Sequence, residues 1–194
     1  MFRSISSALL FCIACLGTVV AFGQDRESPL KVGERAPDFE LPVQGSDEYV
    51  KLSEQLRQGP VVVIVLRGNL GYQCSICKQQ YGSFINRARS LAKAMSGDAR
   101  RVLMIYPGEE KGLESAARQF VGSRQLPEPL LVLRDPGMAM VRDWGLRWDE
   151  RRETAYPATY VIGPGQRVKW SKVSRSHAGR ASVQDVLKAL DNLP

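Results

Sequence analysis

The sequence predicts an α/β fold, in which helices cover both faces of a central mixed β-sheet. Continuous apolar runs at 61–66, 102–106 and 130–133 have the length and composition of buried strands. Segments with helical spacing follow these runs, and this alternation implies parallel strands joined by right-handed crossovers. Two further strand-like runs, 158–162 and 168–173, are separated only by a turn and therefore add antiparallel strands at one side.

The segment that precedes the first central strand is expected to be extended. Pro37 and Pro42 keep it out of a helix. Residues 49–52 have the pattern of a short strand. Ser53 is expected to cap a short helix over 54–57.

The remaining helices are predicted from apolar spacing and from glycine or serine at their ends. We expect a long helix that begins near Cys77 and runs to about Ser96 with Gly97 as its stop, a helix over 113–121, a short helix over 137–144 and a last helix opened by Ser182.

Residues 1–23 have the features of a secretory signal peptide. Arg3 supplies a positive start, Ala8 to Phe22 is almost wholly apolar, and small residues precede Gln24, where cleavage is expected. We therefore expect an exported protein, periplasmic or otherwise extracytoplasmic, with a polar linker over 24–30. The alternative is that the segment is retained and anchors the protein in the membrane.

The overall charge does not point to a nucleic-acid partner. The net charge is +7, and loss of the signal segment would remove only Arg3. The arginines between Arg142 and Arg152 alternate with acidic residues, which is typical of a solvated mixed surface. No nucleic-acid motif is present.

The sequence feature that carries chemistry is the pair Cys74 and Cys77, placed where a strand ends and a helix begins. The free N–H groups and the dipole of a helix N-terminus favour a thiolate, and the first cysteine of such a C-x-x-C can have its pKa lowered to about 3.5–7.5. Arg67 and Lys78 are expected to add positive charge. We predict that the Cys74 thiolate attacks a disulfide and that Cys77, one helical turn on, resolves the mixed disulfide.

Other uses of the cysteines are disfavoured by spacing. A disulfide within C-x-x-C closes too small a ring to constrain much of the chain. A zinc site is disfavoured because Cys12 and Cys15 lie in the signal segment, far from the second pair. His177, the only histidine, fits a surface loop better than a Cys–His hydrolase. A copper-binding or metallochaperone module stays open as an alternative of another class.

A C-x-x-C between a central strand and a helix resembles the arrangement in thioredoxin-fold proteins. Residues 32–41, 129–136 and 141–146 resemble segments of the redoxin or peroxiredoxin-like branch, the alkyl hydroperoxide reductase and thiol-specific antioxidant group. Arg67-Gly68 ahead of the dithiol is similar to members of that branch. The resemblance implies a thioredoxin-like three-layer α/β/α fold with a central mixed β-sheet, in one domain over 31–194.

The resemblance also implies roles for residues outside the dithiol. The proline ahead of the penultimate strand is cis in thioredoxin-like proteins and packs beside the dithiol, and here that role falls to Pro157, next to Tyr156. Tyr72 is expected to shape the groove for a partner. The chain departs from peroxiredoxins at Gly71, where they have Thr or Ser, and at Tyr156-Pro157, where they have Arg.

Together these features predict an exported thiol–disulfide oxidoreductase that exchanges its Cys74/Cys77 pair with substrate proteins. The alternative enzyme is an atypical, peroxiredoxin-like thiol peroxidase that reduces hydroperoxides with the same two cysteines. Either activity needs a thiol–disulfide electron donor and no cofactor or metal. No membrane partner is expected unless the N-terminal segment is retained.

Overall fold

A computed structural model describes residues 26–69, 71–95, 101–123 and 125–193. The expected signal peptide over 1–23 and the helix stop at Gly97 lie outside the described residues. Within the described ranges, no helix is long and apolar enough to cross a membrane.

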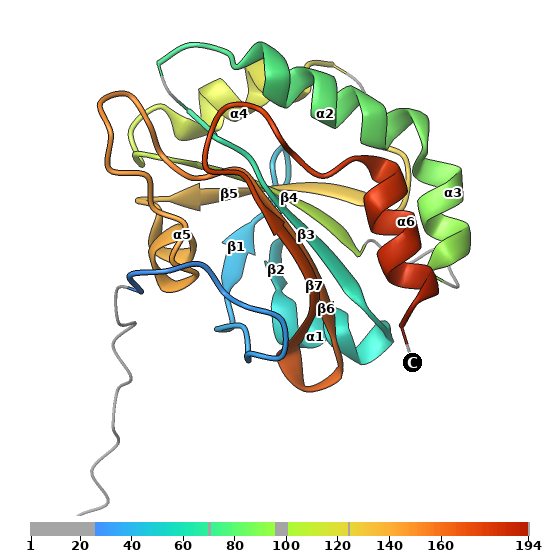
Figure 1. Ribbon diagram of the computed structural model, residues 1–194. Coiled ribbons are helices and arrows are strands. Elements are labelled where there is room, and N and C mark those ends of the chain that lie inside the picture. The colour runs from blue at the N-terminus through green and yellow to red at the C-terminus, as the bar shows by residue number, and fades with distance from the viewer. Residues whose placement is uncertain (1–25, 70, 96–100, 124, 194) are drawn as a thin grey trace, which may run out of the picture.

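A five-stranded mixed sheet forms the centre of the fold, with strand order β5-β4-β3-β6-β7 (Figure 1). Its strands are β3 (Val61–Val65), β4 (Val102–Gly108), β5 (Leu130–Pro136), β6 (Ala158–Gly163) and β7 (Arg167–Val173). β3, β4 and β5 are parallel, whereas β6 runs antiparallel to β3 and to β7. This is the predicted combination of parallel crossovers and a closing hairpin.

Helices pack on both faces of this sheet (Figure 1). One face carries α2 (Ser75–Asn86), α3 (Ala88–Ala94), α4 (Leu113–Val121) and α6 (Val183–Asp191). The other face carries α1 (Leu52–Gln55), α5 (Ala139–Asp143) and a two-stranded sheet of β1 (Glu40–Pro42) and β2 (Tyr49–Lys51). The three-layer α/β/α fold with a mixed sheet is therefore confirmed.

The central strand β3 explains why the sequence shows an unbroken apolar run. Val62 and Ile64 belong to the hydrophobic cluster under α2 and α6, and Val61, Val63 and Val65 belong to the cluster on the opposite face. Successive strand side chains point to opposite faces. All five side chains are fully buried, so no polar residue interrupts the strand.

Two local predictions about helices are wrong. Ser53 does not cap a helix: α1 begins at Leu52, and the Ser53 N–H donates instead to the Asp38 carboxylate at 3.0 Å. The long helix predicted up to Ser96 is two helices, because Arg87 leaves helical geometry, with φ −114° and ψ 17°. The Arg87 N–H bonds the Phe84 carbonyl at 3.2 Å, which tightens the last turn of α2.

Residues 26–30, the described part of the linker expected over 24–30, lie against the domain. Leu30 is 2% exposed and belongs to the core cluster beside α5. The Arg26 N–H donates to the Arg142 carbonyl at 3.2 Å. A side chain at Gly145 would overlap the Ser28 carbonyl, so the two backbone segments are in close contact. Burial of Leu30 and this backbone contact hold the segment to the domain.

Candidate active site

The dithiol lies at the N-terminus of α2, as the sequence predicts. Cys74 is the N-cap residue, with extended backbone angles of φ −72° and ψ 111°, and its Sγ accepts a hydrogen bond from the Cys77 N–H at 3.3 Å. Cys74 is 4% exposed and Cys77 is 1% exposed, and both carry free thiols. A sulfur at the N-cap takes the place that a side-chain oxygen usually fills, and the helix dipole favours its charged form.

Two guanidinium groups flank the sulfurs from different parts of the chain. Arg67, from the loop that follows β3, places Nη1 3.9 Å from the Cys74 Sγ. Arg180, from the loop between β7 and α6, places Nη2 3.8 Å from the Cys74 Sγ and Nη1 3.2 Å from the Cys77 Sγ. Arg180 therefore contacts both members of the dithiol.

These contacts separate the two thiols by acidity. The pKa of Cys74 is lowered, first by a hydrogen bond from the Cys77 thiol, then by the Cys77 N–H and by the charges of Arg180 and Arg67, against the effect of burial. The pKa of Cys77 is raised, first because its thiol donates to Cys74 and then by burial. At neutral pH the arrangement provides one thiolate nucleophile and one protonated partner beside it.

Arg67 is held in place by a buried ion pair with Glu153. Its Nε donates to Oε2 at 2.8 Å and its Nη2 donates to Oε1 at 2.5 Å, in the two-point geometry that suits a guanidinium and a carboxylate. The two side chains are 4% and 10% exposed. The Arg67 carbonyl accepts from the Thr154 hydroxyl, and Nη2 lies 3.5 Å from the Tyr72 hydroxyl.

Glu153 also connects the site to the loop that carries Arg180. His177 Nε2 lies 3.0 Å from Glu153 Oε1, and the Arg180 Nε donates to the His177 carbonyl at 3.4 Å. The Gln80 Oε1 accepts from the Arg180 Nη1 at 3.2 Å. Arg180 is thus oriented from two sides, by its own loop and by α2.

An aromatic stack completes the rim of the site. The Trp148 ring lies 5.7 Å from the Arg67 guanidinium and is stacked on Tyr156 at 4.7 Å with an interplanar angle of 14°. The Arg175 guanidinium lies over the Tyr156 ring, 5.0 Å from its centre. The His177 ring is 5.3 Å from Trp148. Loops 147–157 and 174–182 meet through these contacts.

The residues predicted for the site have different positions in the structure. Arg67, Tyr72, Cys74 and Cys77 are brought together by the contacts above. Lys78 is exposed, and its backbone N–H bonds the Cys74 carbonyl at 3.0 Å, whereas the arginines provide the cations at the sulfur. The Tyr156 ring is stacked on Trp148, which in turn contacts Arg67.

The expectation of a cis peptide bond at Pro157 is wrong. The cis bond among the described residues is Glu128–Pro129. Tyr156 and Pro157 directly precede β6 and are hydrogen-bonded to two other segments. The Tyr156 N–H donates to the Leu146 carbonyl at 2.8 Å, and the Pro157 carbonyl accepts from the Ser174 N–H at 2.8 Å.

Arg180, Glu153, Gln80 and Trp148 were not predicted as site residues. None of them lies in a recognisable motif, and Arg180 is 106 residues from Cys74 in the chain. His177 does lie in an exposed loop, as expected, yet it contacts Glu153. Gly71, three residues before Cys74, has φ +81° and open space around it.

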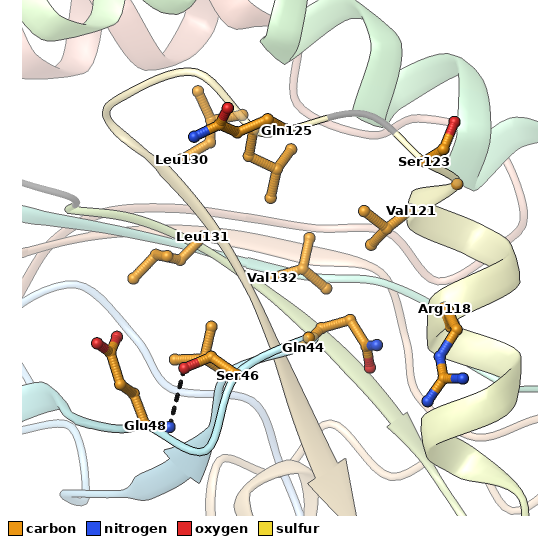
Figure 2. A pocket seen from close by; sticks show the side chains of 14 residues that line it. Gln44, Ser46, Glu48, Arg118, Val121, Ser123, Gln125, Leu130, Leu131 and Val132 are labelled. Atoms are coloured by element: carbon orange, nitrogen blue, oxygen red, sulfur yellow. Dashed lines mark hydrogen bonds between the residues drawn. The ribbon is translucent and has the colours of Figure 1, made fainter.

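A separate cavity of about 580 Å³ lies at the edge of the sheet. It is formed by the start of β5, the end of α4 and the β1–β2 connection, with Gln44, Val121, Leu131 and Val132 among its walls (Figure 2). β5 is parallel to β3, so its start lies at the end of the sheet opposite the dithiol. The cavity is therefore not part of the redox site.

No group of three or more His, Cys, Asp or Glu side chains in the described ranges is placed to hold a metal ion. For the copper alternative, the thiolates of Cys74 and Cys77 are the soft ligands that Cu(I) favours.

The fold is that of thioredoxin-fold proteins, and two free cysteine thiols lie at the start of α2. The AhpC/TSA family profile matches residues 32–171, and the chain belongs to this family. It is accordingly an oxidoreductase of the thiol–disulfide or peroxiredoxin-like type. No curated protein matches the sequence.

Solved peroxiredoxin structures share the fold. Peroxidoxin BcpB from Mycobacterium tuberculosis aligns with a TM-score of 0.63 at 19% identity, over 85% of this chain and 99% of that chain. AhpC from Mycobacterium tuberculosis aligns with a TM-score of 0.61 at 16% identity, over 84% of this chain and 92% of that chain. At these identities the likeness concerns the fold.

Replacing Arg180 tests the origin of the Cys74 thiolate. The pKa of Cys74 is lowered to about 5, so its thiolate forms as the pH rises through that value. We expect Arg180→Gln to raise this pKa by about one pH unit or more, because it removes an adjacent opposite charge. Ultraviolet absorbance of the thiolate during a pH titration measures it. An unchanged titration would mean that Arg180 does not stabilise the thiolate.

Replacing Glu153 tests the buried ion pair. Glu153→Gln removes the carboxylate that pairs with the buried Arg67 at two points, so we expect a loss of roughly 3–5 kcal/mol in the free energy of unfolding. Glu114→Gln is the matched control, since Glu114 is 55% exposed and pairs with Arg118 and, at 3.4 Å, with Arg134, and it should cost less than about 1 kcal/mol. Denaturant unfolding compares the two variants. Equal losses would contradict the account.

Proposed function

We propose that the protein is an exported thiol–disulfide oxidoreductase in which Cys74 exchanges with disulfides of substrate proteins. The observation that carries the proposal is the hydrogen bond that the Cys77 N–H donates to the Cys74 Sγ at 3.3 Å. It stabilises the attacking thiolate and keeps the residue that carries the resolving thiol next to it. Export is supported by the composition of residues 1–23.

The exchange takes place in two substitution steps. The Cys74 thiolate attacks one sulfur of the substrate disulfide, a new S–S bond forms, and the other substrate sulfur leaves as a thiolate. Cys77 then loses its proton and attacks the Cys74 sulfur, which releases the second substrate thiolate. The enzyme dithiol loses two electrons and the substrate disulfide gains them. A thiol–disulfide electron donor restores the dithiol.

Arg180 is suited to both steps because it contacts both sulfurs. Its charge lowers the pKa of Cys74 and opposes the rise in the pKa of Cys77. When Cys77 becomes the nucleophile, the Arg180 Nη1 at 3.2 Å is already within hydrogen-bonding distance of its sulfur. Negative charge can therefore pass from one sulfur to the other beside the same guanidinium.

A second candidate is the reduction of hydroperoxides. Two guanidiniums, at 3.8 and 3.9 Å from a sulfur that is only 4% exposed, favour a small substrate whose oxygens accept hydrogen bonds. Here the Cys74 thiolate takes one oxygen from the hydroperoxide to form a sulfenic acid, and the alcohol leaves. Cys77 then displaces water from the sulfenic acid to form the same disulfide. The absence of a hydroxyl side chain at Gly71 distinguishes this site from typical peroxiredoxins.

Stopped-flow oxidation of the reduced protein separates the two candidates. We expect a protein disulfide to oxidise the dithiol faster than hydrogen peroxide does, and Cys74→Ser to abolish both reactions. Cys77→Ser is expected to accumulate the mixed disulfide on Cys74, because the resolving thiol is missing. Rapid oxidation by peroxide and slow exchange with the protein disulfide would replace the proposal by the peroxidase. Absence of both reactions would refute both candidates.

A further inference from the structure

Two arginines of the site have no carboxylate partner among the described residues. Arg180 is bonded to the two sulfurs, to the Gln80 side chain and to the His177 carbonyl. Arg175 is exposed and lies over the Tyr156 ring, and none of the ion pairs found among the described residues includes it. The carboxylate in contact with the site, Glu153, is already shared by Arg67 and His177.

The charges in contact do not cancel. Arg67, Arg175 and Arg180 supply three positive charges, whereas Glu153 and the Cys74 thiolate supply two negative charges. When the thiolate is consumed in a disulfide, the excess of positive charge grows by one. Positive potential at a reactive group raises the local concentration of anions and their association rate.

Arg175 is held in a defined place although no ion pair fixes it. It is the outer member of a stack in which Trp148 lies 5.7 Å from Arg67, Tyr156 is 4.7 Å from Trp148 and Arg175 is 5.0 Å from Tyr156. Cation–π contact leaves the N–H groups at the edge of a guanidinium free to donate. Arg175 thus presents a positive charge with free N–H donors at the rim, beyond the two aromatic rings.

Resting on the proposed function, we propose that the site prefers disulfide substrates that carry carboxylates. Arg175 adds positive charge at the outer end of the stack and attracts these anions to the site. Arg180 stabilises the thiolate that leaves when Cys74 attacks. The S–S bond of the substrate breaks, a Cys74–substrate S–S bond forms, and Cys77 completes the two-electron transfer as described above.

Three small disulfides of similar size and different charge test the preference: anionic dithiodiglycolate, neutral bis(hydroxyethyl) disulfide and cationic cystamine. Each rate constant for oxidation of the protein is divided by the rate constant of the same disulfide with reduced dithiothreitol, which removes differences in intrinsic reactivity. We expect the normalised rate for dithiodiglycolate to exceed that for cystamine by about tenfold at low salt and to fall as salt is added.

Two arginine variants assign the effect. Arg175→Gln should lower the ratio of the normalised anionic rate to the normalised cationic rate several-fold. Arg57→Gln is the control, because Arg57 is exposed and precedes β3, at the end of the sheet opposite the dithiol, and it should leave the charge preference unchanged.

The outcomes distinguish this inference from the function on which it rests. Equal normalised rates for the three disulfides, or equal effects of Arg175→Gln and Arg57→Gln, would overturn the charge preference and leave disulfide exchange intact. Failure of all three disulfides to oxidise the dithiol would overturn the exchange itself, and the preference with it.

Discussion

The rest of the site depends on the hydrogen bond from the Cys77 N–H to the Cys74 sulfur at the start of α2. A helix N-terminus leaves N–H groups without partners, and a thiolate at the N-cap satisfies one of them. The C-x-x-C spacing puts the resolving thiol on the first turn of the same helix. The strand β3 and helix α2 thereby fix both the nucleophile and the group that resolves it.

A buried charge needs a counter-charge, and this requirement explains the second layer of the site. Arg67 can lie beside Cys74 in a largely buried position because Glu153 pairs with it at two points. Such a pair is weak evidence for stability, since desolvation offsets much of the attraction. Its contribution here is geometric: the carboxylate orients Arg67 toward the sulfur and, through His177, connects it to the loop that presents Arg180.

The parts of the fold set by local pattern could be predicted from the sequence. The apolar runs located the strands, and the order of strands and helices gave the mixed sheet, because hydrophobic periodicity reflects burial directly. The dithiol and Arg67 were predicted together since they lie on one short stretch between β3 and α2. Ser53 does not cap the helix because α1 already begins at Leu52. The Asp38 carboxylate, 15 residues away in sequence, accepts the Ser53 N–H.

The contacts between distant loops could not be predicted in the same way. Arg180 and Glu153 lie in polar stretches with no periodicity, and their roles appear only when loops 147–157 and 174–182 meet. Pro157 is expected to be cis by resemblance, but the cis bond among the described residues is Glu128–Pro129, and Tyr156 and Pro157 bond to Leu146 and Ser174. Contacts between distant loops depend on tertiary packing rather than on residue type.

The central claim is that the structure divides the dithiol into an acidic nucleophile and a protonated partner. The most direct measurement is the pH dependence of alkylation at each cysteine of the reduced protein, resolved by peptide mass spectrometry. The account predicts that Cys74 is alkylated with a midpoint near its lowered pKa of about 5, while Cys77 stays unreactive through neutral pH. Equal reactivity of the two thiols with a midpoint near the ordinary cysteine value of about 8.5 would contradict it.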